Sequence, residues 1–185
     1  MILALVLLAL AGYTLWVFNR LVRARNQVQV AWSDVDVQLQ RRHDLVPLLV
    51  ETVRGYAQYE SALLERVTEE RSQARQAQGL AQRSDQEVAL GVDLGRLVAL
   101  REAYPELKAS DNFRQLSVQL VDIEDALQHA RRFYNGSVRQ YNTDIQRFPD
   151  LLMARVTGFH DADFFAAETD ARATVAVHLG TEPTP

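Results

Sequence analysis

The sequence predicts an all-α protein, in which an N-terminal transmembrane helix is followed by an antiparallel bundle of long helices. The first 18 residues carry no charged side chain. After them, apolar residues recur at alternating spacings of three and four along two long stretches, which is the repeat of helices that pack lengthwise against each other. Glycine and proline are scarce, with 8 and 5 among 185 residues, so the chain is helix-rich rather than loop-rich.

The apolar N-terminal segment predicts a membrane anchor over residues 1–19. Ile2 to Phe18 forms 17 uncharged residues, the short end of the ~17–25 that cross a bilayer as a helix. A cleaved signal peptide is the alternative, but it would place a basic region before the apolar run. The side chains expected at the membrane interface are Tyr13, Trp16, Arg20, Arg23 and Arg25.

Basic residues indicate how this anchor is oriented. Three arginines follow the apolar segment closely, Arg41 and Arg42 come later, and no basic side chain precedes it. Because cytoplasmic flanks carry the excess of lysine and arginine, we expect a single-pass protein with its N-terminus outside and its body in the cytoplasm. Export of the whole domain regardless of charge is the alternative.

The stretch from Asn19 to about Gln78 predicts one long helix. Its only helix breakers are Pro47 and Gly55. A proline inside a helix removes one backbone hydrogen bond, so we expect a bend at Pro47 and no break. At ~1.5 Å per residue this helix would be about 90 Å long and would need partner helices alongside. Its apolar seam comprises Val28, Trp32, Val35, Leu39, Val46, Leu49, Val53, Tyr56, Leu63 and Val67, with Arg42 and Glu60 as polar interruptions.

Two further helices are predicted after a turn at residues 79–85. Ser84 or Asp85 would cap the second, over residues 86–104, and Pro105 would end it. Ser110 would cap the third, which stops before a second proline at 149. The seam of this third helix comprises Phe113, Leu116, Leu120, Ile123, Leu127, Ala130, Tyr134, Ser137, Tyr141 and Phe148.

The C-terminal part carries a weaker pattern. We expect residues 151–156 to form a short apolar turn, and Asp161 or Asp163 to cap a last helix near 164–172. The helical bundle therefore covers residues 20–172. The tail at 173–185 has too little pattern to decide between an extended piece and disorder.

Composition and motifs argue against several functions. A net charge of −4 offers no basic surface for nucleic acid. The absence of cysteine excludes disulfides, thiol catalysis and cysteine-ligated metals. No phosphate-binding, dinucleotide-binding, zinc-protease or nucleophile-elbow motif occurs. We therefore predict no cofactor, no metal and no enzymatic activity.

Two clusters of polar residues have a functional and a simpler interpretation. His43 and Asp44, beside two arginines, could form a relay, but adjacent helical positions point about 100° apart, which favours solvated charges near a kink. His160, Asp161 and Asp163 could bind a cation, although a glycine-containing breaker with helix-capping aspartates explains the same residues.

A Tyr-Asn pair repeats after seven residues, at 134–135 and 141–142. This spacing places both tyrosines on one seam of the third helix and both asparagines just beside it. We expect the rings to pack with their hydroxyls at the edge of the seam. The asparagines would fix helix register, as a buried asparagine does in coiled coils, and a row of ligand-binding groups is the alternative.

Several of these motifs together resemble the LemA family of bacterial single-span membrane proteins. The likeness covers about residues 18–170, and it departs at Leu48, where asparagine is expected, and at Tyr59, where histidine is usual. It implies the anchor and the antiparallel bundle, located in the bacterial inner membrane, and it supplies no activity. The residues that carry it as structural motifs are Trp32, Asp36, Leu39, Pro47, Gly55, Tyr56, Tyr104, Pro105, Tyr134, Asn135, Tyr141, Asn142, Phe148 and Pro149.

Three functions remain open on this basis. The first is a membrane-anchored, non-enzymatic scaffold or interaction protein, whose partners are the lipid bilayer and either a second copy or other membrane proteins. The second is a membrane-organising or lipid-binding module that uses the basic residues after the anchor. The third is a regulator of a membrane enzyme or signalling protein.

Overall fold

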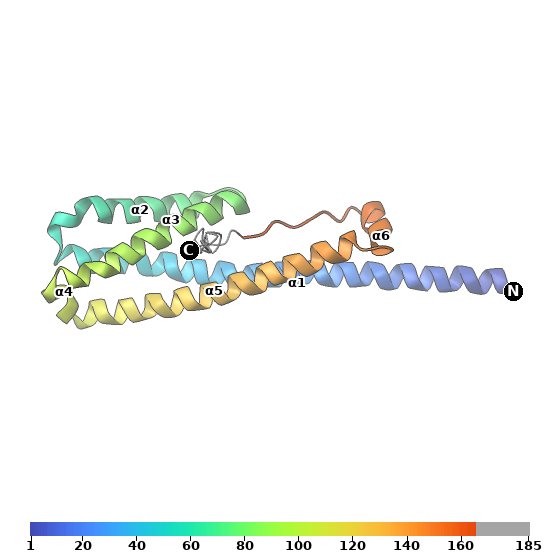
Figure 1. Ribbon diagram of the computed structural model, residues 1–185, viewed down its shortest axis with the longest axis horizontal. Coiled ribbons are helices and arrows are strands. Elements are labelled where there is room, and N and C mark those ends of the chain that lie inside the picture. Colours follow the sequence, from blue (N-terminus) through green and yellow to red (C-terminus); the bar gives the residue numbers. More distant parts are fainter. Residues whose placement is uncertain (166–185) are drawn as a thin grey trace, which may run out of the picture.

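The computed structural model describes residues 1–165, which form an elongated all-α arrangement (Figure 1). Its longest element is α1 (Ile2–Arg54), a single helix of 53 residues and therefore about 80 Å long. The N-terminal part of α1 projects alone from one end of the molecule, and its C-terminal part lies inside the bundle (Figure 1). The predicted fold class is confirmed.

Pro47 lies inside α1 without ending it. Proline has no N–H, so the carbonyl of His43, four residues earlier, loses its helical donor. The Nε of Arg71, on the neighbouring helix α2, donates to this carbonyl at 2.6 Å. A side chain of another helix therefore replaces the hydrogen bond that Pro47 removes, and α1 continues past it.

The chain turns back after α1, so the prediction of one helix from 19 to 78 is wrong. The N–H groups of Tyr56 and Ala57 both donate to the Val53 carbonyl, at 3.0 and 2.8 Å, and Ala57 leaves the helical region with φ −119° and ψ 63°. A short 3₁₀ turn, η1 (Gln58–Glu60), leads into α2 (Ser61–Gln76), which packs back along α1. The spacing of three and four continues through the turn because both helices face the same core.

The next helix, α3 (Leu80–Ala99), begins six residues before its predicted start. Gly79 precedes it with φ 84°, a left-handed conformation that glycine adopts without steric cost. The turn is therefore shorter than the predicted 79–85, and Ser84 is buried within the helix instead of capping it. The antiparallel pair of α2 and α3 covers the C-terminal half of α1 (Figure 1).

Two short elements lead from α3 to the second long helix. They are η2 (Leu100–Glu102) and α4 (Pro105–Ala109), in which Pro105 occupies the first turn, where its missing N–H costs nothing. Ser110 then caps α5 (Asp111–Gln146), accepting a hydrogen bond from the Phe113 N–H at 3.4 Å. This cap confirms the predicted start of the third helix, and α5 runs alongside α1 for most of its length (Figure 1).

The chain ends its described part with a short helix and an extended segment. After a cis peptide bond between Phe148 and Pro149, α6 (Asp150–Thr157) forms where an apolar turn was expected. Gly158, with φ 74°, ends it. Residues 159–165, here called the strap, then run back without helical structure. The predicted helix at 164–172 is thus absent at Phe164 and Phe165, and the rest of it and the tail at 173–185 lie outside the described residues.

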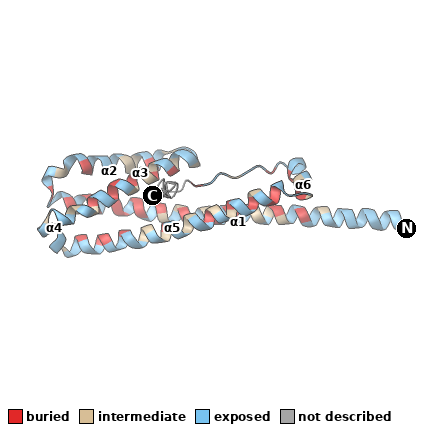
Figure 2. Ribbon diagram, in the orientation of Figure 1, coloured by how far each residue is buried: buried red, intermediate tan, exposed pale blue. Residues whose placement is uncertain are grey.

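Buried residues are distributed along the helices of the bundle (Figure 2), and the apolar ones form two clusters. One lies among α1, α2, α3 and α5, and the other lies between α1 and α5 and includes α6 and the strap. Most of the predicted seam residues belong to them. Tyr56 and Phe148 do not, since 41% and 75% of their surfaces are exposed: the first lies in the turn after α1 and the second in the turn before α6.

Candidate functional site

The N-terminal part of α1 carries a large exposed apolar surface. Its most apolar 18-residue window has a mean hydropathy of 2.1, and only 6% of that window is buried. Leu3 and Leu8 are 72% and 73% exposed, whereas a core helix of a globular protein would bury such side chains. By length and composition, α1 is the one described helix that could cross a membrane.

The five predicted interface residues lie where this surface meets the bundle. The rings of Tyr13 and Trp16 stack with centroids 6.1 Å apart, and the Arg20 guanidinium lies 5.3 Å above the Trp16 ring. Arg25 lies in the same way over Phe159 of the strap, at 5.2 Å. These are cation–π contacts, so two of the three predicted cations pack against rings of the protein itself.

Arg20 also has two carboxylate partners. It donates to Asp150, at the start of α6, and lies 3.5 Å from Asp144 near the end of α5. The Asp150 side chain is almost completely buried. This ion pair fastens α6 to α1, and of the three predicted cations Arg23 and Arg25 are exposed.

The repeated Tyr-Asn pairs of α5 hold the strap. Asn142 donates to the Ala162 carbonyl and accepts from the Ala162 N–H, both at 2.9 Å. Asn135 does the same with Phe165, at 3.0 and 2.9 Å. Each amide thereby pairs with one residue of the strap much as a neighbouring β-strand would. The asparagines therefore fix the strap, whereas register between helices was expected.

The two tyrosines reinforce this attachment. The Tyr134 hydroxyl donates to the Asp163 carbonyl at 2.8 Å, and the Tyr141 hydroxyl donates to the His160 carbonyl at 2.9 Å. Burial raises the pKa of both hydroxyls, which keeps them protonated as donors. The strap is thus held at both tyrosines.

Trp32 and Asp36 connect three parts of the molecule. The Trp32 ring lies 5.5 Å from that of Tyr134 and 6.0 Å from that of Phe165. Arg83 of α3 lies 5.4 Å above the same ring and pairs with Asp36 at 2.5 Å. These two motif residues of α1 therefore attach the start of α3 and the end of the strap.

The other motif residues occupy structural positions. Leu39 is fully buried between α1 and α5, and Gly55 lies at the turn after α1. The Tyr104 hydroxyl donates to Glu60 at 3.1 Å and thereby ties η1 to the connection before α4. No motif residue lines a pocket with a convergent pair of catalytic groups in the part of the chain described here.

A buried cluster of charged residues was missed by sequence reasoning. Arg42, His43 and Glu87 have exposed fractions of 1%, 2% and 0%, so the prediction of solvated charges is wrong for Arg42 and His43, whereas Arg41 and Asp44 are exposed as expected. Arg42 and His43 are adjacent in α1 and point in different directions, yet each of them reaches a different oxygen of the Glu87 carboxylate. Arg42 Nη1 lies 3.3 Å from Oε2, and His43 Nε2 lies 2.8 Å from Oε1.

This cluster, here called the polar layer, connects all four long helices of the bundle. Arg42 Nε lies 2.9 Å from Glu124 on α5, and Arg42 Nη2 donates to the Glu87 carbonyl on α3 at 3.1 Å. Arg71 on α2 joins it through the His43 carbonyl. A signal was present in the sequence, because Arg42 occupies a seam position, three residues after Leu39 and four before Val46. Its burial excludes substrate, so the polar layer is structural.

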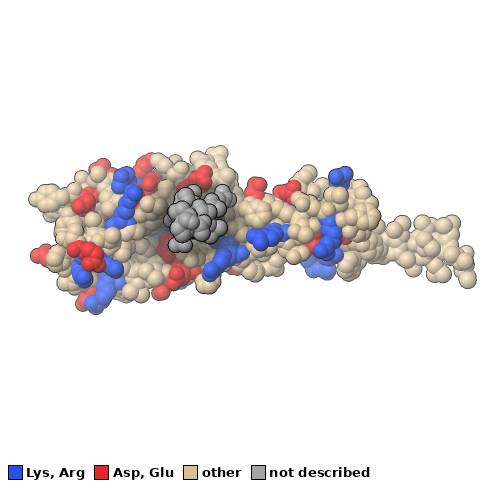
Figure 3. Space-filling view, in the orientation of Figure 1, with Lys and Arg blue, Asp and Glu red and all other residues tan. Residues whose placement is uncertain are grey.

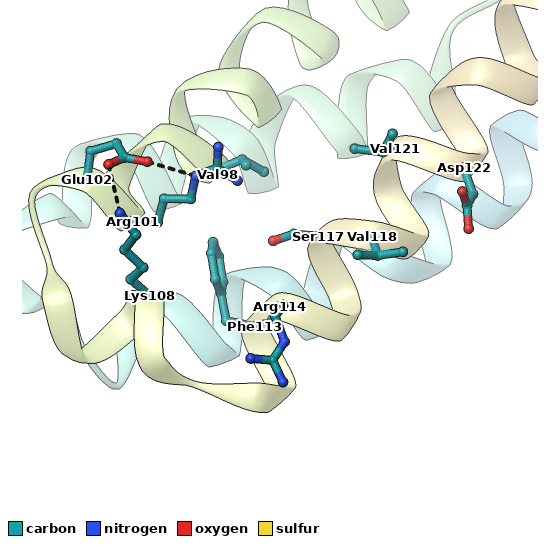
Figure 4. Close-up of a pocket in the computed structure, with 10 residues that line it drawn as sticks. All are labelled: Val98, Arg101, Glu102, Lys108, Phe113, Arg114, Ser117, Val118, Val121 and Asp122. Carbon is teal, nitrogen blue, oxygen red and sulfur yellow. Dashed lines mark hydrogen bonds and ion pairs between the residues drawn. The ribbon is translucent and has the colours of Figure 1, made fainter.

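An open groove lies between α3 and α5 near η2 and α4 (Figure 4). Its volume is about 630 Å³, and Val118 and Val121, each 57% exposed, contribute to an apolar wall on α5. At one end Glu102 accepts hydrogen bonds from Arg101 and Lys108, at 3.1 and 3.2 Å. These bonds hold the pKa of the Glu102 carboxyl below its usual range.

The groove combines an apolar wall with charged and polar lining residues. Its remaining lining residues are Val98, Phe113, Arg114, Ser117 and Asp122. Ser117 is buried, and its hydroxyl has no hydrogen-bond partner in the structure. No histidine is among the lining residues, and neither of the two lining carboxylates, Glu102 and Asp122, makes a hydrogen bond to the Ser117 hydroxyl, so the pair of nucleophile and base that hydrolytic catalysis needs is not formed in this groove.

The predicted alternative of a cation site does not gather its ligands. His160, Asp161 and Asp163 are exposed on the strap, and Asp161 accepts a hydrogen bond from Gln146 at 2.9 Å. Within residues 1–165, no group of three His, Cys, Asp or Glu side chains is arranged to hold a metal ion.

The fold and its exposed apolar helix define an all-α protein with one candidate membrane span. Within this class the chain belongs to the LemA family, whose model matches residues 31–179. The resemblance to this family is therefore confirmed.

Two kinds of relative are similar to the chain. Magnetosome protein MamQ 1 of Paramagnetospirillum magneticum and Magnetosome protein MamQ of Magnetospirillum gryphiswaldense are each 27% identical over 174 residues, covering 80% of this chain and 64% of their own length. Protein LemA of Metamycoplasma hominis is 27% identical over 159 residues, covering 85% of this chain and 72% of its own. The chain thus spans less than two thirds of the magnetosome proteins.

Proposed function

We propose that this chain is a membrane-anchored, non-enzymatic interaction protein. The N-terminal part of α1 crosses the bilayer, and the bundle presents a binding surface at a fixed distance from it. The observation that carries the proposal is the continuity of α1: one helix contains both the exposed apolar segment and the buried seam of the bundle. The magnetosome relatives carry names that state no reaction.

The groove between α3 and α5 is the proposed binding surface. Its walls are helices, its exposed valines are apolar and its ends are charged, which suits an amphipathic helix of another protein. The lack of a convergent catalytic pair in this groove favours binding over a reaction. The body faces the cytoplasm in this proposal, because the basic residues follow the span.

The anchor is tested by charge insertion. Leu5→Arg together with Leu8→Arg places two charges in the span, each costing about 2.5–3.5 kcal/mol near its centre, and should release the full-length chain from membranes. Val30→Arg, a similarly exposed position of α1, is the matched control and should leave the chain bound. If the unchanged chain, the Leu5→Arg/Leu8→Arg variant and the Val30→Arg variant all resist alkaline extraction from membranes, the proposed anchor is contradicted.

Binding in the groove is tested by crosslinking in native membranes. A photoreactive residue at Val121 should give one discrete adduct, whereas the same residue at Val30, equally exposed at 57%, should not. Val118→Glu should abolish the adduct without lowering Tm, because this side chain is 57% exposed. Equal adducts at both positions would argue against a binding role for the groove.

A further inference from the structure

The short helix α6 lies beside the apolar segment of α1. An apolar groove of about 320 Å³ separates them, lined by Leu10, Tyr13, Thr14 and Val17 on one side and by Pro149, Leu152, Met153 and Val156 on the other. The Thr14 hydroxyl is already satisfied, since it donates to the Ala11 carbonyl at 2.8 Å. All four α1 residues precede Arg20, the first charged side chain of the helix.

The outer face of α6 is apolar and exposed. Leu152 and Val156 are 57% and 85% exposed, and their spacing of four places them on the same face of the helix. Phe148, four residues before Leu152, is 75% exposed in the preceding turn. The opposite face is buried, with Asp150 and Ala154 each at 2%. Soluble surfaces rarely carry such a contiguous apolar stripe.

The position of α6 indicates which environment covers the apolar stripe formed by Phe148, Leu152 and Val156. The groove brings Leu152 and Val156 alongside α1 residues 10–17, and these belong to the segment proposed to lie in the membrane. The apolar stripe is therefore continuous with the exposed apolar surface of α1. If Arg20 marks the level of the headgroups, then α6 lies on the hydrocarbon side of that level.

The attachment of α6 suits such an environment. The Arg20 charge is neutralised by Asp150 and Asp144, which reduces the cost of placing it at the bilayer surface. The Phe159 N–H donates to the Ala154 carbonyl at 3.0 Å and so satisfies one backbone group at the end of α6, as a membrane requires. The Phe159 ring packs 6.0 Å from that of Phe18.

Exposed basic residues flank the same end of the molecule. Arg23, Arg147 and Arg155 are exposed, and Figure 3 shows basic side chains near the place where the uncharged projection leaves the body. Long arginine side chains can extend from the apolar boundary to anionic headgroups. The charge pattern is therefore that of an element lying at a membrane surface.

We propose that α6 is a membrane-embedded foot, which lies in the bilayer beside α1 and holds a lipid acyl chain in the groove between them. This inference rests on the proposed function, because it requires α1 to enter the bilayer. It adds a second membrane contact, formed by a segment about 140 residues after the apolar part of α1 in the sequence. The proposed occupant of the groove between α1 and α6 is a lipid acyl chain and not another protein.

Single-cysteine labelling tests the foot, because the chain contains no cysteine of its own. Val156→Cys in the full-length chain is labelled with an environment-sensitive fluorophore and reconstituted into vesicles of phosphatidylcholine and phosphatidylglycerol. Leu5→Cys serves as the control within the span, and Val30→Cys as the control in water. We expect the Val156→Cys label to shift to the blue and to be quenched by spin-labelled acyl chains as strongly as that of Leu5→Cys, with loss of quenching by iodide.

The outcomes separate the two proposals. If the Val156→Cys label behaves like that of Val30→Cys while the Leu5→Cys label is quenched by lipid, the foot is refuted and the anchor stands. If the Leu5→Cys label is also quenched by iodide, the anchor itself fails. Protection of the Val156→Cys label from both quenchers would show a protein contact and would equally overturn the foot. Leu152→Cys provides a second position on the same face.

Discussion

Pro47 and Arg71 are expected to be energetically coupled, because Arg71 supplies the hydrogen bond that the proline removes. Arg71→Met leaves the His43 carbonyl without its donor, which costs about 1–3 kcal/mol for a partly buried acceptor. Pro47→Ala restores an N–H four residues after His43 and adds a good helix former, a gain of up to about 3 kcal/mol. In that background the carbonyl has a donor again, and Arg71→Met should cost no more than ~0.5 kcal/mol.

A double-mutant cycle measures this coupling. The four proteins are unfolded thermally in detergent and followed by circular dichroism, and the coupling should be about 1–2 kcal/mol. For a chain of this size that corresponds to about 2–8 °C in Tm. Arg75→Met, at an exposed position of the same helix, is the control and should be additive with Pro47→Ala. Additivity of Arg71→Met with Pro47→Ala within ~0.5 kcal/mol would refute the reasoning.

Four further outcomes follow from the described contacts. Arg42→Met should destabilise the bundle by about 3–5 kcal/mol, because a buried carboxylate loses its cation; a loss below ~1 kcal/mol, typical of surface pairs, would exclude this. Gly91→Ala should lower Tm, since its Cβ would lie 2.8 Å from Arg42 Nη2, whereas Gly95→Ala, with nothing within 4 Å, should raise it. Asn142→Ala should speed amide hydrogen exchange in the strap, seen by mass spectrometry, with little change in Tm. Burial raises the pKa of Glu70 above 4.5, so its ionisation opposes folding: Glu70→Gln should raise Tm near neutral pH, and this gain should vanish as pH falls below 4.5.

The elements predicted correctly from sequence are those with local signals. The Ser110 cap and the proline at 105 act on neighbouring backbone groups, so their effect can be read within a few residues. The charge-free segment before Arg20 is equally local. By contrast, the turn after α1 was missed because the heptad spacing continues through it, and spacing alone does not distinguish one long helix from two that face the same core.

Tertiary contacts determined the features that the sequence did not reveal. Whether Arg42 lies in water or in the core depends on the presence of Glu87 and Glu124 on two other helices. The Tyr-Asn repeat indicated a packed edge of α5 but not its partner, because the strap has no secondary-structure pattern of its own. The groove between α3 and α5 likewise depends on tertiary structure, because its lining residues come from elements that are placed beside each other only in the folded chain.

The polar layer gives these long helices a defined register. On α1 it falls between Leu39, the last member of one apolar cluster, and Leu45, the first member of the other. An uninterrupted apolar seam would allow α5 to slide along α1 by one heptad, about 10 Å, at little cost. Such a slide would separate Arg42 from Glu124 and leave a buried charge with one partner fewer, a loss of several kcal/mol. The same pairing therefore fixes how far α6 and the groove between α3 and α5 stand apart along α1, and under the proposed function it would hold a partner bound in that groove at a constant height above the membrane.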